Sequence, residues 1–169
     1  MPNIILIGMP ASGKSTVGVI LAKLLGYDFI DTDLLIQRRE GSRLSEIIAS
    51  RGVDGFLAAE ESACLSVNAE HCVIATGGSA VYSAAAMAQL KARGRVVYLK
   101  TDYETLSARL KDISGRGVVL RPGQTLEQLY AERVPLYEKY ADIIVPEGEG
   151  TLEDTVASVF RECKQSLSE

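Results

Sequence analysis

The sequence predicts an α/β fold built on a parallel sheet with helices on both faces. Three observations predict it: short, β-branched apolar runs recur along the chain, longer segments with helical periodicity separate them, and a glycine-rich loop joins the first run to the first helix. The strands are expected at residues 4–7, 27–30, 72–75, 96–99 and 143–145. The helices are expected at residues 14–25, 44–50, 53–68, 83–93, 103–112, 125–140 and 152–163. Pro135 should kink the sixth helix or split it in two.

The first elements illustrate the signals used for the rest. Residues 4–7 read Ile-Ile-Leu-Ile, a continuous apolar run typical of a strand that is buried on both faces. The next segment carries apolar residues at helical spacing, which are Val17, Ile20, Leu21, Leu24 and Leu25. The later strands are runs of the same kind, and no repeat or low-complexity segment interrupts the alternation.

Length and composition limit the class of protein. A chain of 169 residues suits one domain, 1–169, that buries its core without disulfides, and the three cysteines lack metal-ligand spacing. The formal net charge of −4 argues against a nucleic-acid partner. There is no apolar run near the roughly 20 residues of a membrane span and no secretory signal. We therefore expect a cytoplasmic monomer that binds small molecules and neither a membrane nor nucleic acid.

A glycine-rich motif follows the first strand. Residues 8–15 match the pattern Gly-x-x-x-x-Gly-Lys-Ser, which is typical of phosphate-binding loops. Gly8 and Gly13 allow positive φ, so main-chain N–H groups can converge on phosphate oxygens at the start of the next helix. Lys14 supplies a cation for the β- and γ-phosphates, and the Ser15 hydroxyl can ligate Mg²⁺. The motif predicts a nucleoside triphosphate site; the alternative is a glycine-rich turn without a ligand.

Two acidic residues follow the second strand. Asp31 and Asp33 flank Thr32, and side chains two positions apart in an extended chain point the same way. Phosphoryl transfer to an alcohol needs a carboxylate that orients the hydroxyl and acidic groups around Mg²⁺. We therefore assign Asp33 to the acceptor hydroxyl and Asp31 to the outer shell of the metal. The alternative is that one of these three residues only caps the following helix.

A second glycine-rich segment, Thr76-Gly77-Gly78-Ser79, follows the third strand. Ligands gather at the carboxyl ends of parallel strands, and adjacent glycines let backbone amides approach a ligand closely. A tight structural turn would have the same sequence, so this segment is supporting evidence only.

The second half of the chain holds the candidate arginines. Residues 113–123 are rich in glycine around Arg116, which predicts a mobile loop that acts as a short lid. An arginine should neutralise charge on the transferred phosphoryl group, and Arg116 is our first choice. Arg109 could stack its guanidinium on adenine. Solvated surface arginines are the alternative for each of them taken alone.

Taken in order, these motifs resemble those of the shikimate kinase family. The resemblance adds the segment Arg133-Val134-Pro135-Leu136-Tyr137 and covers nearly the whole chain. It implies a P-loop kinase of the nucleoside-monophosphate-kinase type, with three layers, a five-stranded parallel sheet in the order 2-3-1-4-5, and ATP and Mg²⁺ as cofactors. By the same resemblance, Asp33 holds the acceptor hydroxyls, Arg133 pairs with the substrate carboxylate, and Gly77 and Gly78 lie beside the substrate. Arg116 matches the lid arginine, and Arg109 the residue on adenine.

Two positions depart from the family pattern. Leu57 replaces an arginine that would hold the substrate carboxylate, and Ser79 replaces the third glycine of the substrate loop. Leucine offers no donor to an anion. Shikimate is the expected acceptor. The alternatives are a paralogous kinase for another hydroxylated metabolite and a non-catalytic ATP-binding regulator.

The expected site can be summarised by role. The catalytic set is Lys14, Asp33 and Arg116, and the metal set is Ser15 and Asp31. The nucleotide-binding set is Gly8, Ala11, Ser12, Gly13, Lys14, Ser15, Thr16, Arg109 and Arg116. The substrate-binding set is Asp33, Gly77, Gly78, Ser79 and Arg133.

Overall fold

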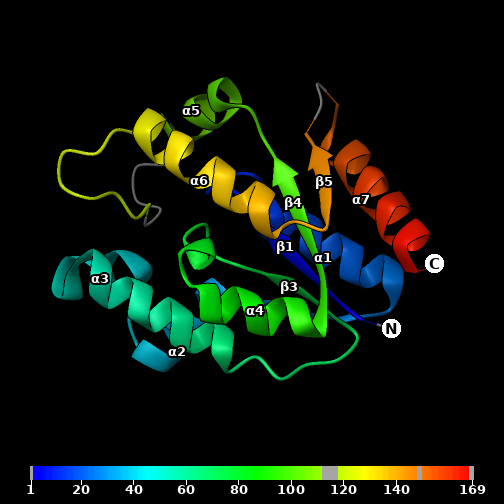
Figure 1. Cartoon of the computed structure of the whole chain (residues 1–169), viewed down its shortest axis with the longest axis horizontal. Helices are drawn as coiled ribbons and strands as arrows, with labels where there is room; N and C mark the ends of the chain where they lie inside the picture. The colour runs from blue at the N-terminus through cyan, green and yellow to red at the C-terminus, as the bar shows by residue number, and fades with distance from the viewer. Residues whose placement is uncertain (1, 112–117, 148–149, 168–169) are drawn as a thin grey trace.

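A computed structural model describes residues 2–111, 118–147 and 150–167 and has a five-stranded parallel sheet at its centre (Figure 1). The strands are β1 (Asn3–Ile7), β2 (Asp28–Asp31), β3 (Cys72–Ala75), β4 (Gly94–Lys100) and β5 (Ile143–Pro146). Their order is β2-β3-β1-β4-β5, and every neighbouring pair is parallel. The predicted α/β class and the strand order are therefore confirmed.

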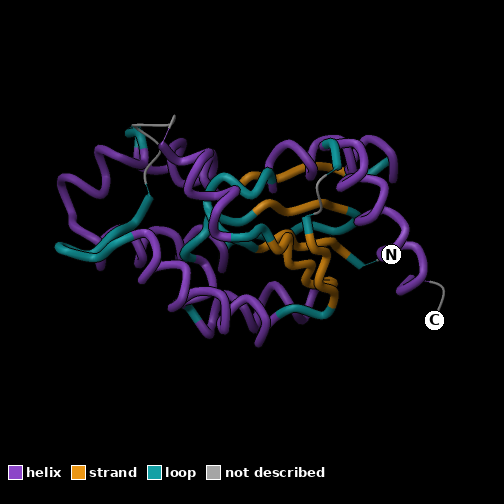
Figure 2. The backbone as a smooth tube through the Cα atoms, turned by 90° about the horizontal axis from the view of Figure 1, so that it is seen from above, coloured by secondary structure: helices purple, strands orange, loops and turns teal. Residues whose placement is uncertain are grey.

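Helices cover both faces of the sheet. They are α1 (Lys14–Leu25), α2 (Thr32–Glu40), α3 (Leu44–Leu65), α4 (Ala84–Arg93), α5 (Tyr103–Lys111), α6 (Leu126–Tyr140), α7 (Leu152–Leu167) and a short 3₁₀ helix, η1 (Ala80–Tyr82). Helices α1 and α7 pack on one face, and α3, α4 and α6 pack on the other (Figures 1 and 2). The result is a three-layer structure with the sheet in the middle.

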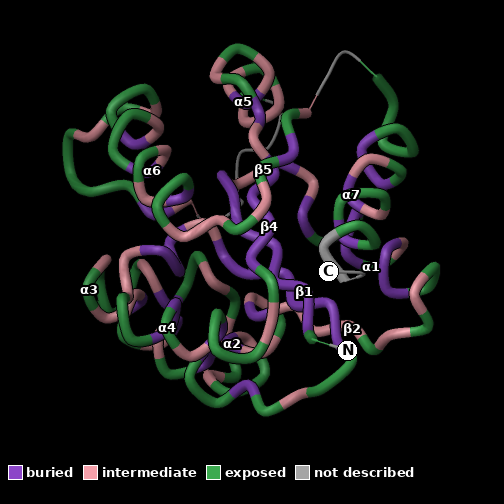
Figure 3. The backbone as a smooth tube through the Cα atoms, turned by 45° about the vertical axis from the view of Figure 1, so that its right-hand side comes forward, coloured by how far each residue is buried: buried purple, intermediate pink, exposed green. Residues whose placement is uncertain are grey.

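The central strand β1 shows how the sequence builds two cores. Ile5 and Ile7 belong to the cluster under α4 and α6, while Ile4 and Leu6 belong to the cluster under α1 and α7. Alternate side chains of a strand point to opposite faces, so a sheet covered on both sides needs an unbroken apolar run. All five residues of β1 are buried (Figure 3).

The structure differs from the sequence prediction in three helices. Helix α2 was not predicted, because its apolar residues lack a strong amphipathic pattern and Leu34 is half exposed. The predicted helices 44–50 and 53–68 meet at Gly52, whose non-helical backbone, with φ 70°, marks a kink inside α3. Helix α6 continues through Pro135, so of the two predicted outcomes, a kink or a split, the split is excluded.

None of the helices in the described ranges has both the length and the apolar character needed to cross a membrane.

Candidate active site

A pocket of about 400 Å³ opens where β1, β2 and β3 end. The phosphate-binding loop forms one wall, and the starts of α2 and α3 form another. The loop after β3 and Arg133 of α6 complete the lining. Most of the residues predicted for the two substrates therefore line one pocket, namely Ala11, Gly13, Lys14, Ser15, Thr16, Asp33, Gly77, Gly78, Ser79 and Arg133.

The phosphate-binding loop has the backbone that its glycines predict. Gly13 has φ 80° and forms the N-cap of α1, and Gly8 has φ 150°. A methyl group on Gly8 would lie 2.8 Å from the main-chain oxygen of Leu99, so the loop can pass this strand only without a side chain. Ala11 also has positive φ, at 64°, which is uncommon outside glycine. The conformation leaves the start of α1 at the pocket, where a helix favours an anion.

Lys14 lies buried beneath the loop, with 7% of its surface exposed. Its Nζ donates to the main-chain oxygens of Gly8, at 2.8 Å, and Met9, at 2.7 Å. Burial lowers the pKa of Lys14 to about 8, although the nearby Asp33 carboxylate opposes this change. The ammonium group is therefore held beneath the loop, in a position where added negative charge would raise the pKa of Lys14.

Ser15 and Asp31 form the contact expected of a metal-binding pair. The Ser15 hydroxyl donates to Asp31 Oδ2 at 2.6 Å. Asp31 Oδ1 accepts from the main-chain N–H groups of Asp33 and Leu34, so Asp31 also caps α2, as the alternative interpretation predicted. A hydroxyl and a carboxylate are the oxygen ligands that Mg²⁺ takes, and this ion keeps several of its waters. Among the described residues no group of three or more His, Cys, Asp or Glu is arranged to hold a metal ion.

Two carboxyl groups, of Asp33 and Glu60, meet beside Gly77 in the same pocket. A methyl group on Gly77 would lie 2.7 Å from Asp33 Oδ1 and closer still to Glu60 Oε1. The Gly77 N–H donates to the Thr32 hydroxyl at 3.1 Å, which fixes the loop against α2. Glycine at position 77 is therefore required because the backbone passes between these two acids.

Glu60 is a site residue that the sequence did not reveal. It is 1% exposed, its Oε2 accepts from the Ser79 hydroxyl, and its Oε1 has no hydrogen-bond partner within the described part of the chain. Burial raises the pKa of Glu60 to about 7, and the bond from Ser79 partly offsets this rise. The available signal was its place on the buried face of α3, four residues after Phe56. Ser79, which departs from the family pattern, thus partners this acid.

Arg133 of α6 lines the pocket and is 1% exposed. It donates from Nη2 to the main-chain oxygen of Val119 at 3.2 Å and from Nε to the Tyr82 hydroxyl at 3.3 Å. A methyl group on Gly78 would lie 2.9 Å from Arg133 Nη1. Tyr137 of α6 lies in the core, and its hydroxyl donates to the Gly78 oxygen at 2.6 Å. The loop after β3 therefore contacts α6 at Gly78.

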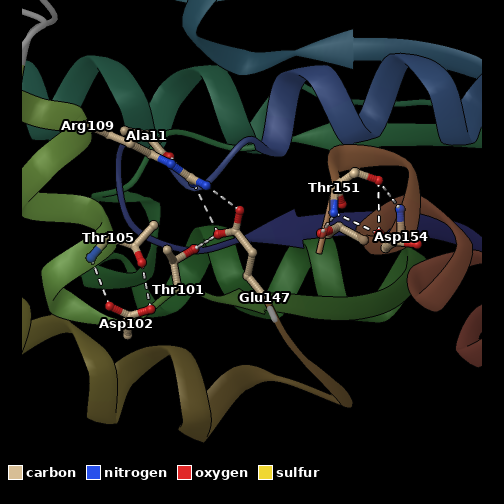
Figure 4. A network of polar contacts seen from close by, with 9 residues as sticks. Ala11, Thr101, Asp102, Thr105, Arg109, Glu147, Thr151 and Asp154 are labelled. Carbon is tan, nitrogen blue, oxygen red and sulfur yellow. Dashed lines mark hydrogen bonds and ion pairs between the residues drawn. The ribbon is translucent and has the colours of Figure 1, made fainter. Parts of the chain in front are cut away.

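Arg109 lies in a polar network behind the phosphate-binding loop (Figure 4). Its guanidinium makes two bonds to Glu147, at 2.6 and 3.1 Å, and a third to the main-chain oxygen of Ala11 at 3.0 Å. Glu147 also accepts from the Thr101 hydroxyl. These contacts join α5 and the end of β5 to the loop. The predicted lid arginine, Arg116, lies outside the described residues, as do the lid residues 113–117.

Comparisons with known proteins show the family of the chain. The family model for shikimate kinase matches residues 10–165. A shikimate kinase of Histophilus somni is 40% identical over 151 residues, which cover 87% of this chain and 86% of that protein.

Solved structures give the same result. The shikimate kinase of Acinetobacter baumannii in complex with shikimate is 34% identical, with a TM-score of 0.83, covering 98% of this chain and 94% of that one. The shikimate kinase of Aquifex aeolicus is 33% identical, with a TM-score of 0.84 and 98% of both chains covered. The chain therefore belongs to the shikimate kinase family.

Proposed function

We propose that this chain transfers the γ-phosphoryl group of ATP to a hydroxyl of shikimate and forms shikimate 3-phosphate and ADP. Membership of the family makes the chain an ATP-dependent small-molecule kinase. The single observation that carries the proposal is that Lys14 and Asp33, which follow two different strands, line the same pocket. A phosphate anchor and a carboxylate that can receive a hydroxyl proton are thus present together.

In the proposed reaction, Lys14 and the loop N–H groups hold the β- and γ-phosphates while Asp33 accepts a hydrogen bond from the acceptor hydroxyl. The hydroxyl oxygen forms a bond to the γ-phosphorus as the bond to the β,γ-bridging oxygen breaks. The proton of the hydroxyl passes to the Asp33 carboxylate, and ADP leaves with the bridging oxygen. Such a transfer depends mainly on positioning and on stabilising charge. Arg116 would add positive charge to the transferred group.

The proposed metal is Mg²⁺, held by the Ser15 hydroxyl and, through water, by Asp31. The supporting observation is the 2.6 Å contact between these two side chains at the start of α1. When bound, the ion would neutralise charge on the β- and γ-phosphate oxygens. Asp31 would keep its place because its other oxygen caps α2.

The acceptor would lie between Asp33 and Arg133. The backbone of Gly77 and Gly78 forms the wall between them, where no side chain fits. Ser79 would contribute by holding Glu60, whose carboxylate accepts from its hydroxyl. The solved relative from Acinetobacter baumannii, with shikimate bound, supports shikimate as the occupant.

One observation favours a second candidate, a kinase for another hydroxylated acid. Leu57 lines a separate pocket of about 170 Å³ beside Glu60 and Glu61, and it does not line the main pocket. The position that carries an arginine in the family pattern therefore gives the acceptor no cation in this chain.

The test is ADP release by the purified chain with ATP, Mg²⁺ and shikimate, with the product identified by mass spectrometry. We expect release that depends on shikimate and a product heavier by one phosphoryl group. Lys14→Met should abolish it. Shikimate-independent release, or turnover with other hydroxylated acids only, would contradict the proposal, and a panel of such acids run in parallel would identify the second candidate.

A further inference from the structure

We infer that Arg43 is the second cation on the acceptor's carboxylate and so determines the specificity of the pocket. The inference rests on the proposed function, because it names the residue that recognises the anionic end of that acceptor. Arg43 stands directly before α3 and lines the main pocket together with Leu44 and Ser45.

Of the four arginines between residues 38 and 51, only Arg43 lines this pocket. Arg51 pairs with Glu40, and Arg39 donates to the main-chain oxygen of Ser62 at 3.2 Å. Arg38 is exposed on α2 and is not part of the lining. The Arg43 guanidinium has no hydrogen bond or ion pair with any side chain or backbone group in the described ranges. It is therefore available to a ligand.

The charges of the pocket explain why an anionic acceptor needs Arg43. Asp33 and Glu60 meet at Gly77, and the buried Glu60 Oε1, without a partner in the described residues, points to a ligand that donates a hydrogen bond there. A carboxylate would be repelled from that end and must lie near a cation. Arg133 already gives two of its five N–H donors to Val119 and Tyr82, which leaves three for a carboxylate that can accept about four hydrogen bonds.

The main-chain N–H of Arg43 donates to Glu46 Oε2 at 2.8 Å, but an arginine side chain is unfavourable at this position, which argues for a role beyond the helix. Arg43 is the N-cap of α3, where Ser, Thr, Asp and Asn are preferred because their side chains accept from the first turn. An arginine has no acceptor, and its charge lies at the positive end of the helix dipole. Residues that break a local rule in this way concentrate at functional sites.

The test compares wild type with Arg43→Ser, a variant that supplies a proper cap and so should fold well. We expect the KM for shikimate to rise by about 10- to 100-fold, as for the loss of a charge-assisted hydrogen bond, with the KM for ATP within about twofold. The melting temperature should rise by about 2 to 4 °C. Arg38→Ala is the matched control and should change neither KM.

An acceptor without the carboxylate charge tests whether Arg43 acts on that charge. With the carboxamide of shikimate as acceptor, Arg43→Ser and wild type should have the same KM. An equal KM for shikimate in the two proteins, or an equal penalty with the carboxamide, would overturn the inference while the proposed function stands. A wild-type chain without shikimate turnover would overturn the proposed function itself, and the inference with it.

Discussion

The buried carboxyl group of Glu60 should make the stability of the protein depend on pH. In the folded chain burial raises its pKa from 4.5 to about 7. The folded state therefore holds a proton that the unfolded state releases between these two pH values, and the unfolding free energy falls as pH rises. The contribution of Glu60 is fully present below pH 4.5 and is lost by the time the pH has passed 7. At 1.36 kcal/mol for each unit of pKa, the loss is about 3 kcal/mol.

Glu60→Gln removes the ionisable group and keeps the shape of the side chain. We expect the stability of this variant, relative to wild type, to increase by about 3 kcal/mol between pH 4.5 and pH 8. The assay is urea unfolding followed by circular dichroism at several pH values, with the difference between the two proteins as the readout. Glu70→Gln, at an exposed position before β3, is the control and should give a flat difference. A flat difference for Glu60→Gln as well would refute the reasoning.

Three further predictions concern the two ends of the pocket. The pKa of Lys14 is lowered to about 8, and bound phosphates should raise it, so ATP binding at pH 8 should take up about half a proton. Calorimetry in buffers of different ionisation enthalpy measures this uptake, and the absence of uptake would contradict the prediction. Gly77→Ala should displace the Asp33 and Glu60 carboxyl groups and lower kcat/KM for the acceptor by about 10- to 100-fold, with the KM for ATP unchanged. An unchanged kcat/KM would show that neither carboxyl group acts on the acceptor. Arg109→Ala and Glu147→Gln should each raise the KM for ATP by about two- to fivefold, a modest effect because the ion pair is partly exposed. An effect of Arg109→Ala alone would instead support stacking on adenine.

The elements that the sequence predicted are those with strong local signals. The apolar run of β1 and the glycine pattern of the loop specify their conformations almost independently of the rest of the chain. Asp31 and Asp33 could be placed at the pocket because parallel strands bring their carboxyl ends to one edge. The sequence left open whether Asp31 caps α2, since one carboxylate can cap a helix and bind a hydroxyl at once.

The features that the sequence did not predict depend on contacts between distant segments. Glu60 lies at the pocket because α3 turns its buried face toward the loop after β3; its spacing from Phe56 indicates a buried position but not the segment that it contacts. The pair of Arg109 and Glu147 joins positions 38 residues apart. Tyr137 reaches Gly78 only after α6 has packed on the sheet. Tertiary packing brings these three sets of residues into contact, and their partners cannot be read from residue spacing.

The central claim is that Asp33 aligns an acceptor hydroxyl with a phosphoryl group held by the loop, and one variant tests it most directly. Asp33→Asn keeps the size of the side chain but removes the proton acceptor. The measurement is kcat/KM for shikimate together with the dissociation constant for ATP. We predict a loss of about 10²- to 10⁴-fold in kcat/KM with ATP affinity unchanged. A rate within threefold (~0.7 kcal/mol) of wild type would contradict the account.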